Sequence, residues 1–482
     1  MRLRDARWAD IALASVLGAY VIGFIAFWPT VLSVDDEERY VGQAVAFSRG
    51  MLRLPGAVPL ATTALSTDYP PGTSLLQTPF VMLGGWRAAA LLSVISLIFA
   101  TLITRRWLRI SGLAGWTALL VPGFVASLVF GRIAMSDVPS AAMVVLSLML
   151  FWQSRASGNA ALAFASGLVA ALSLLFRETN AVLLLPFFVG ALLRRNSAFR
   201  WMFLGGLLGV AIRLWLASMF FGSPFYIRPS GYGFSLAAAV HNTPIYGFIL
   251  LVLFPFGALL PLAYRGPLRA EMRWSAYLFM ATFLFYEYAG RESGGAKQIL
   301  LAARYMLPLV PVLAFMAGEV GPRLLRPFFE SDRGRQVNGG IAVFASMALV
   351  VAAFAVHPAM HRQDAMATEM VSALARTTSD SIPVYVNLES ARKYLSAVYQ
   401  TRLLNDRSMR AIDTMPQVLR RFGSAQLVIL DRLDSEYHRK RAEENVQFYE
   451  SMSKRCSLHL VTDEWHGASL HLRVYDISSC SS

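Results

Sequence analysis

Long apolar runs recur along the first three-quarters of this 482-residue chain. Many of them extend for about 17–25 residues, which is enough for a helix to cross the roughly 30 Å hydrocarbon core of a bilayer. Only 15% of the residues are charged, whereas a soluble protein carries about 25%. These runs predict a polytopic α-helical membrane protein and exclude a water-soluble globule.

The apolar runs divide into about eleven predicted transmembrane helices. The first follows a basic N-terminus and is too long for the apolar region of a cleaved signal peptide, so we interpret it as a retained span. A shorter apolar segment at residues 70–83 follows a Pro-Pro pair, and we expect it to form a helix on the outer surface or a partly re-entrant helix. The predicted spans lie at roughly residues 10–32, 87–104, 112–130, 138–153, 160–176, 180–193, 202–221, 244–263, 274–289, 303–321 and 338–357.

The arginines gather in alternate loops between these spans. With the N-terminus in the cytoplasm, the arginine-rich loops all face inward, as the positive-inside rule requires. This topology accounts for most of the net charge of +14 without a nucleic-acid partner. We therefore predict a multi-pass protein of the cell membrane. The first outer loop holds a group of acids, namely Asp35, Asp36, Glu37, Glu38 and Asp68.

After residue 357 the apolar runs give way to short β-type segments that alternate with amphipathic stretches. This pattern predicts a soluble α/β domain at 358–482 after a transmembrane domain at 1–357, which includes the first outer loop at 33–86. An odd number of spans places the soluble domain outside the cytoplasm. The expected strands are 382–386, 425–430, 457–462 and 469–475, and the expected helices are 365–377, 390–399 and 435–453.

The last two expected strands form a hairpin, which would bring Cys456 and Cys480 opposite one another. A disulfide between them suits an oxidising compartment and would contribute about 2–4 kcal/mol. Two unpaired thiols are the alternative.

Function is sought first among the acids at the outer membrane boundary, because charge at a membrane edge is costly and often functional. A carboxylate of the run 35–38 could take a proton from an incoming hydroxyl, or bind a metal or a cationic substrate. A solvated acidic loop is the alternative. Asp137, on the second outer loop, is another candidate, although it or Ser136 could instead cap the next helix.

A third group of candidates is mostly cationic and lies at the outer ends of later spans. Arginine binds phosphate oxygens with two parallel hydrogen bonds, so such a group suits a lipid phosphate. Side chains that merely reach toward lipid headgroups are the alternative. The members are Arg177, Glu178, Arg213, Arg228, Arg291, Lys297 and Arg304.

Five short motifs follow one another between about residues 8 and 320. They are Asp36-Glu37-Glu38-Arg39-Tyr40 with Ala44; Tyr69-Pro70-Pro71-Gly72; Arg132 with Asp137-Val138-Pro139; Phe176-Arg177-Glu178-Thr179 with Pro186; and Arg304-Tyr305-Met306-Leu307-Pro308 with Pro311. In this order they resemble the GT-C superfamily of membrane glycosyltransferases that use polyprenyl-phosphate sugars. The similarity is to the branch of the protein O-mannosyltransferases and the lipid A aminoarabinose transferases. Two features depart from that pattern: Tyr69 replaces a His or Lys, and an extra acid, Asp35, precedes the first motif.

The resemblance implies an inverting glycosyltransferase that moves a sugar from a polyprenyl-phosphate donor to a protein, lipid or envelope glycan on the outer face of the membrane. It implies that Asp36 is the general base, while Glu37 and Asp137 orient the acceptor or hold a divalent metal. No cofactor is certain, and the partners expected are the lipid-linked donor, membrane lipid and an acceptor of unknown kind. The residues expected to bind substrate or phosphate are Arg39, Tyr40, Tyr69, Arg132, Arg177, Glu178, Lys297, Arg304 and Tyr305.

Two other classes of function stay open at this point. A transporter or flippase for a lipid-linked or small solute would use the same acids as a cation path, but it should show polar residues through the membrane rather than at one face. A structural or assembly protein would use the exported domain to bind cell-wall polymer, and it would not need the acids.

Overall fold

A computed structural model describes residues 2–50, 69–193, 197–227, 232–288, 295–330, 332–377, 384–386, 403–404, 410–433, 436–468 and 470–481. By its contacts the chain divides into two units. The helical unit comprises Met1–Phe27, Pro70–Leu76 and Ala90–Pro358. The mixed unit comprises Trp28–Tyr69, Gln77–Ala89 and Ala359–Ser482. The expected division into 1–357 and 358–482 stays a prediction, because the two units are groups of contacts and not tested domains.

Within the described residues, six helices are long and apolar enough to cross a membrane. A seventh is counted if the pair Gly295–Met306 and Val310–Leu324, bent by 78°, forms one span. The membrane-protein class is therefore confirmed, with fewer full-length spans than the eleven expected. The six are Trp8–Ala26, Trp86–Ile110, Asp137–Ser157, Ala198–Phe221, Leu236–Leu253 and Ile341–Arg362.

The difference in number comes from apolar segments that form short or broken helices. The expected spans at 160–176 and 180–193 form the shorter apolar helices Ala160–Leu175 and Asn180–Gly190. The segment 112–130 breaks into three pieces around a Pro-Gly pair, because proline and glycine both weaken a helix interior. The segment expected at 244–263 starts earlier and stops before Pro255, which cannot donate a backbone hydrogen bond.

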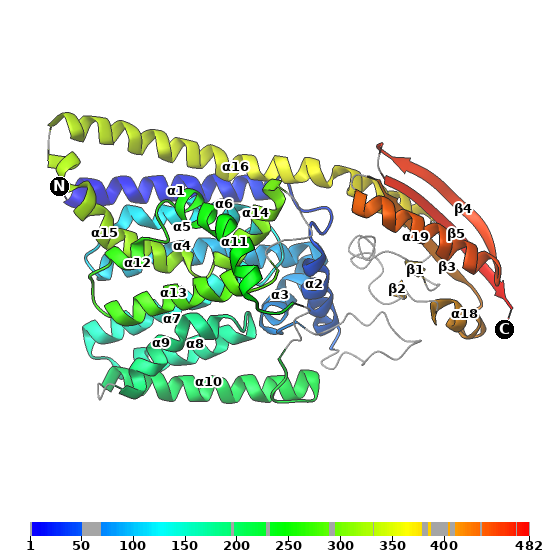
Figure 1. Ribbon diagram of the computed structural model, residues 1–482, viewed down its shortest axis with the longest axis horizontal. Coiled ribbons are helices and arrows are strands. Elements are labelled where there is room, and N and C mark those ends of the chain that lie inside the picture. The colour runs from blue at the N-terminus through cyan, green and yellow to red at the C-terminus, as the bar shows by residue number, and fades with distance from the viewer. Residues whose placement is uncertain are drawn as a thin grey trace. The chain divides into compact units, whose positions relative to one another are not determined.

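The helices follow one another as shown in Figure 1. Their bounds are α1 (Arg2–Ala26), α2 (Asp35–Ser48), α3 (Gly72–Gly84), α4 (Leu91–Ile110), α5 (Leu120–Gly123), α6 (Val125–Phe130), α7 (Asp137–Ser157), α8 (Ala160–Leu172), α9 (Asn180–Leu193), α10 (Ser197–Phe221), α11 (Leu236–Phe248), α12 (Leu260–Ala263), α13 (Arg269–Phe285), α14 (Gly295–Ala303), α15 (Val310–Glu330), α16 (Asp332–Thr377), α18 (Arg410–Phe422) and α19 (Glu436–Ser453). Five short helical segments lie beside these helices. Trp86–Ala90 precedes α4 and Gly115–Leu119 precedes α5. Ser173–Leu175 follows α8, Ile249–Leu253 follows α11 and Arg304–Met306 follows α14. As expected, residues 70–83 form a helix, α3, which at 13 residues is too short to span a bilayer.

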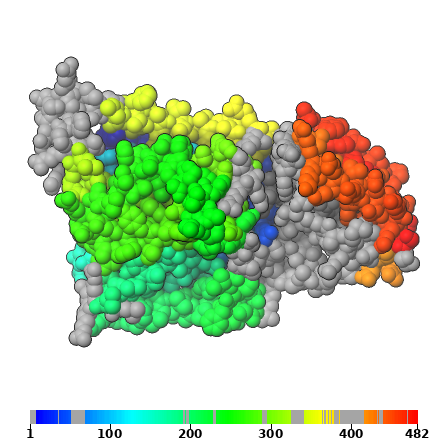
Figure 2. All heavy atoms as spheres, viewed as in Figure 1, coloured from blue at the N-terminus to red at the C-terminus, as the bar shows by residue number. Residues whose placement is uncertain are grey.

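Helices α8 and α10 lie side by side, and glycines set how closely they approach (Figure 1). A Cβ added to Gly205 would lie 1.9 Å from the Phe164 carbonyl oxygen, and one added to Gly167 would lie 1.8 Å from that of Met202. A Cβ added to Gly209, four residues after Gly205, would lie 2.9 Å from the Leu168 carbonyl oxygen. Backbone contact of this kind is a common basis of helix packing in membranes, where the hydrophobic effect does not drive association. Figure 2 shows the green atoms of α10, α11 and α13 covering much of the visible face of the helical unit.

Helix α16 is a single helix of 46 residues that continues through Pro358. The sequence predicted a span ending at 357 and a separate helix at 365–377, because the apolar run gives way to a polar amphipathic stretch there. Instead the helix joins the last candidate span to the first elements of the mixed unit without a break.

The mixed unit contains a five-stranded sheet with the order β2-β1-β3-β5-β4. Its strands are β1 (Val384–Val386), β2 (Leu403–Leu404), β3 (Ala425–Arg432), β4 (Cys456–His466) and β5 (Leu470–Cys480). Strands β1, β2 and β3 are parallel, and β5 runs antiparallel to both β3 and β4. The expected helix at 390–399 and the start of the strand at 382–386 lie outside the described residues.

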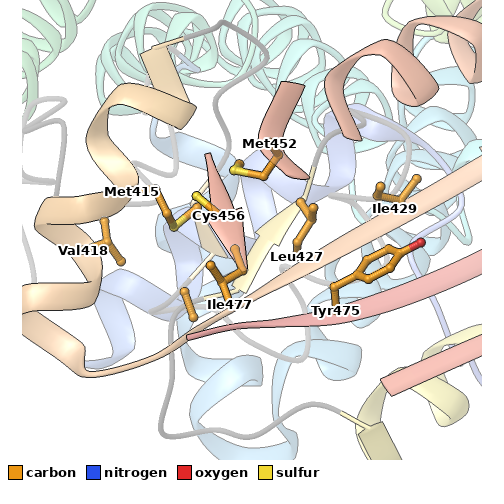
Figure 3. Close-up of a cluster of buried hydrophobic side chains, with 9 residues drawn as sticks. Met415, Val418, Leu427, Ile429, Met452, Cys456, Tyr475 and Ile477 are labelled. Carbon is orange, nitrogen blue, oxygen red and sulfur yellow. The ribbon is translucent and has the colours of Figure 1, made fainter. Parts of the chain in front are cut away.

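One hydrophobic core holds this sheet to its helices (Figure 3). Met415 and Val418 of α18 and Met452 of α19 point toward Leu427 of β3 and Ile477 of β5. Beside this core, Cys456 and Cys480 are direct partners across the β4–β5 pair and are joined by a disulfide. The alternation of β segments with amphipathic stretches thus corresponds to a small sheet packed against helices.

Candidate active site

The predicted site residues fall into two groups, one in each unit. In the mixed unit, Asp36 stands on the first turn of α2, half-buried, and its Oδ1 accepts a hydrogen bond of 2.5 Å from the Tyr69 hydroxyl. The Tyr40 ring packs edge-on against Tyr69, with ring centroids 4.8 Å apart. The Arg39 guanidinium lies 5.3 Å from the centre of the Tyr69 ring. Three of the predicted residues, Asp36, Arg39 and Tyr40, therefore surround the buried phenol of a fourth, Tyr69.

Glu37 has a structural role that burial alone would not reveal. Its Oε2 accepts from the backbone N–H of Ser33 at 2.5 Å and from that of Val34 at 3.2 Å. These amides precede the first turn of α2, where no backbone carbonyl is available to them, so the carboxylate closes the start of the helix. These two hydrogen bonds favour a role for Glu37 in holding the start of α2 in place over a role in binding substrate.

In the helical unit, Asp137 begins α7 and is buried, with 3% of its side chain exposed. It forms an ion pair with Arg177, whose side chain is 14% exposed. The pair stands at the N-terminus of α7, where the helix dipole also favours a negative charge. The side chain of Ser136 makes no capping hydrogen bond to α7. Asp137 therefore joins the start of α7 to the turn that carries Arg177.

Tyr305 brings the second arginine to this ion pair. Both Arg177 and Arg304 lie 5.0 Å from the centre of its ring, and Arg304 also donates to its hydroxyl at 3.2 Å. Phe283 stacks on the same ring at 4.9 Å. Arg304 is 6% exposed and occupies the bend between α14 and α15. Two guanidinium groups thus meet at one aromatic ring, an arrangement that favours an anion.

Tyr246 of α11 is a member of this cluster that the sequence did not reveal. Its side chain is buried, and it interacts electrostatically with Tyr305, Arg177 and Arg304. Within the described part of the chain, its hydroxyl has no hydrogen-bond partner. A buried phenol hydroxyl usually has one, so this donor is available to a bound group. No motif surrounds Tyr246, and inside an apolar helix it looks like an ordinary core residue.

The remaining predicted residues lie around these groups. Arg132 is buried and donates through Nη1 to Nδ1 of His357 at 3.1 Å. Glu178 pairs with Arg213 at 3.1 Å, and Arg213 also donates to the Tyr226 carbonyl. Lys297 is exposed on α14. Arg228 and Arg291 lie outside the described residues.

The divalent-metal expectation for Glu37 and Asp137 finds no support in these side chains. In the ranges that the structure covers, no group of three or more His, Cys, Asp or Glu side chains is placed to hold a metal ion. The Glu37 carboxylate binds backbone amides and that of Asp137 binds Arg177. The metal role of Glu37 and Asp137 therefore stays a prediction, and no step proposed below passes through a metal ion.

No protein-family model matches this chain, and no curated protein matches its sequence. Comparison with solved structures shows that it shares the fold of ArnT from Cupriavidus metallidurans. Two ArnT structures match over nearly the whole chain. The apo form gives a TM-score of 0.57 at 14% identity over 97% of each chain. The form bound to undecaprenyl phosphate gives 0.59 at 13% identity over 98% of this chain and 99% of ArnT.

The archaeal oligosaccharyltransferase of Archaeoglobus fulgidus is less similar, with a TM-score of 0.44 at 12% identity over 94% of this chain and 72% of that one. The resemblance inferred from the five motifs is thus confirmed at the level of the fold. ArnT matches across nearly its whole length, so the agreement includes the C-terminal region, which no motif covered.

Proposed function

We propose that this protein is an inverting glycosyltransferase that moves a sugar from a polyprenyl-phosphate donor to an acceptor at the outer face of the membrane. The observation that carries the proposal is the full-length agreement with ArnT, a protein whose structure has been solved with undecaprenyl phosphate bound. The two clusters support it by their chemistry, because one offers a carboxylate and the other offers two guanidinium groups.

In the proposed reaction, Asp36 accepts the proton of an acceptor hydroxyl or amine. The acceptor oxygen or nitrogen then forms a bond to the anomeric carbon of the donor sugar. The bond from that carbon to the phosphate oxygen breaks, and its electron pair leaves with the polyprenyl phosphate. Attack opposite the leaving group inverts the anomeric configuration.

The leaving phosphate gains negative charge as this bond breaks, and cations that are already in place stabilise it. Arg304 and Arg177 are the proposed ligands, with Lys297 as an exposed third cation. The Asp137 carboxylate neutralises Arg177 in the free protein and keeps its position fixed. The Tyr69 hydroxyl holds one oxygen of Asp36 and so orients the proposed base.

The decisive experiment supplies the purified protein with polyprenyl-linked sugars and follows loss of sugar from the lipid. Wild type should release the sugar, and Asp36→Asn should slow release by roughly 10²–10⁴-fold, the usual contribution of a general base. Glu450→Gln, which changes an exposed acid of α19, is the matched control and should keep full activity. Equal rates for wild type and Asp36→Asn would refute the base assignment, and no turnover with any donor would refute the transferase.

The orientation is part of the proposal and has its own test. We propose that the N-terminus faces the cytoplasm and that the mixed unit faces outward, which follows from the arginine-rich inner loops. A reporter fused after the C-terminal residue should respond to the compartment outside the cytoplasm. A cytoplasmic signal would place Asp36 on the wrong side for an externally displayed donor and would refute this topology.

A further inference from the structure

The part of α16 near and beyond Pro358 carries a row of polar residues along one face. His357, Asp364 and Thr368 are separated by seven and then four residues, so they lie one above another on the same side of the helix. His357 and Asp364 are buried, with 0% and 8% exposed. The buried members of this row need partners, because burying polar groups without them is costly.

Each member of the row contacts a segment that leads into one of the two candidate acids. In the mixed unit, Asp364 Oδ2 accepts from the Ser33 hydroxyl at 3.1 Å, and Thr368 Oγ1 lies 2.7 Å from Thr30 Oγ1. Thr30 and Ser33 belong to the stretch that immediately precedes α2. The contacts from α16 therefore fix the chain where it enters the helix that carries Asp36.

Ser33 is held from two directions at once. Its backbone N–H donates to Glu37, one turn into α2, and its hydroxyl donates to Asp364 on α16. Asp36 lies between Ser33 and Glu37 in the sequence, on the turn that these bonds close. A change in either bond therefore moves the backbone that carries the proposed base.

The second contact lies in the helical unit. The Arg132 guanidinium donates to Nδ1 of His357, and the Tyr20 ring packs against the His357 ring with centroids 4.5 Å apart. A Cβ added to Gly23 would lie 2.6 Å from the imidazole, so α1 closes over this histidine. Arg132 opens the loop that ends at Asp137, five residues later. His357 thus anchors the loop that leads into the buried ion pair.

We propose that Asp364 and His357 are positioning residues for sugar transfer, and that α16 holds the loops before Asp36 and before Asp137 in their reactive places. The inference rests on the proposed transferase function and deepens it. Neither residue touches the reacting atoms in this scheme. Each acts by fixing a loop, through Ser33 in one case and Arg132 in the other.

The kinetic test replaces Asp364 and Ser33 and measures sugar release with the polyprenyl-linked donor. Asp364→Leu removes the acceptor of the Ser33 hydrogen bond, and Ser33→Ala removes its donor. Each should lower kcat by roughly 10–100-fold with little change in KM for the donor, because misplacement of about 1 Å has effects of this size. Asp364→Asn keeps an oxygen acceptor and should retain most of the activity.

A control variant and a double variant distinguish loss of positioning from a general loss of folded structure. Ser372→Ala removes an exposed hydroxyl of the same helix, one that bonds only within α16, and should leave kcat unchanged. The Ser33→Ala/Asp364→Leu double variant should be about as slow as the slower single variant, since both changes break the same bond. Multiplying losses, or a wild-type kcat in Asp364→Leu, would overturn the proposal. If Asp364→Leu does not fold, Ser33→Ala alone still decides, because it deletes one oxygen atom.

Amide hydrogen exchange of the full-length protein gives a test that does not depend on turnover. Asp364→Leu should speed exchange at the first turn of α2, and His357→Leu should speed it in the loop from Arg132 to Asp137. His357→Gln retains an acceptor for Arg132 and should restore most of the protection. Unchanged exchange at both places would refute the positioning role. A wild type that releases no sugar would instead refute the proposed function, so the two failures are distinguishable.

Discussion

Breaking the ion pair between Asp137 and Arg177 should cost the protein several kcal/mol of stability. The two side chains are only 3% and 14% exposed, so water cannot solvate either charge well once its partner is gone. Removing one partner of a buried pair typically costs about 3–5 kcal/mol, mainly because the other charge stays buried without compensation. We expect Asp137→Asn to lower the free energy of unfolding by about that amount.

The double variant makes this prediction specific. Asp137→Asn combined with Arg177→Gln leaves no uncompensated charge, so it should recover a large part of the stability lost by Asp137→Asn alone. The measurement is unfolding of the full-length protein in mixed detergent micelles, followed by the signal of its tryptophans. Glu178→Gln, at the neighbouring half-buried pair with Arg213, is the comparison variant and should cost less than Asp137→Asn, because the Glu178 side chain is 30% exposed. A loss below about 1 kcal/mol for Asp137→Asn, or additive losses in the double variant, would show that this pair is not held as a buried charge pair.

Three further predictions use other contacts. Tyr246→Phe should weaken binding of undecaprenyl phosphate by roughly 3–10-fold in a titration, as expected for one lost hydrogen bond. Tyr277→Phe is the control: it deletes another phenol hydroxyl that has no hydrogen-bond partner in the described chain, and it should leave binding unchanged. Gly205→Leu should prevent α8 and α10 from packing and lower the midpoint of thermal unfolding markedly, since its Cβ would overlap a backbone carbonyl. Cys456→Ser should lower the free energy of unfolding of the sheet region by about 3 kcal/mol, the chain-entropy value for a disulfide between residues 24 apart. Cys480→Ser should lower it by the same amount, and urea unfolding measures both.

The sequence predicted features that depend on local composition. Run lengths identified the membrane class, and a run of acids at the outer end of the first predicted span pointed to Asp36 as a candidate. Alternating β segments located most of the final sheet. What it missed depends on contacts between distant residues: Tyr69 reaches Asp36 across 33 residues, and His357 reaches Arg132 across 225. No local sequence pattern specifies such a pair. Motifs can therefore identify the residues, but they cannot predict which of them contact each other.

The effect of a proline on these helices depends on its surroundings. Helix α16 continues through Pro358, beyond the predicted end of the span at 357, because one missing N–H removes only one hydrogen bond of a long helix. Pro416 lies inside α18, a helix that the sequence analysis did not predict. Conversely, the proline of the segment 112–130 is followed by glycine, and there the helix does break. A proline is thus a weaker stop signal when long apolar or amphipathic stretches flank it.

Two of the four consecutive acids that begin α2, Asp36 and Glu37, can be distinguished by what their carboxylates bind. The side chain of Asp35 lies outside the described part of the structure. Glu37 is 4% exposed and bonded to two backbone amides, so using it as a base would open the start of the helix. Asp36 is half-buried and shares one oxygen with the Tyr69 hydroxyl, a contact that a phenol can lengthen without unwinding any backbone. A base must accept a proton and return to its place in each cycle. Of Asp36 and Glu37, that requirement favours Asp36, and it gives the Tyr69 hydroxyl a role in holding the proposed base.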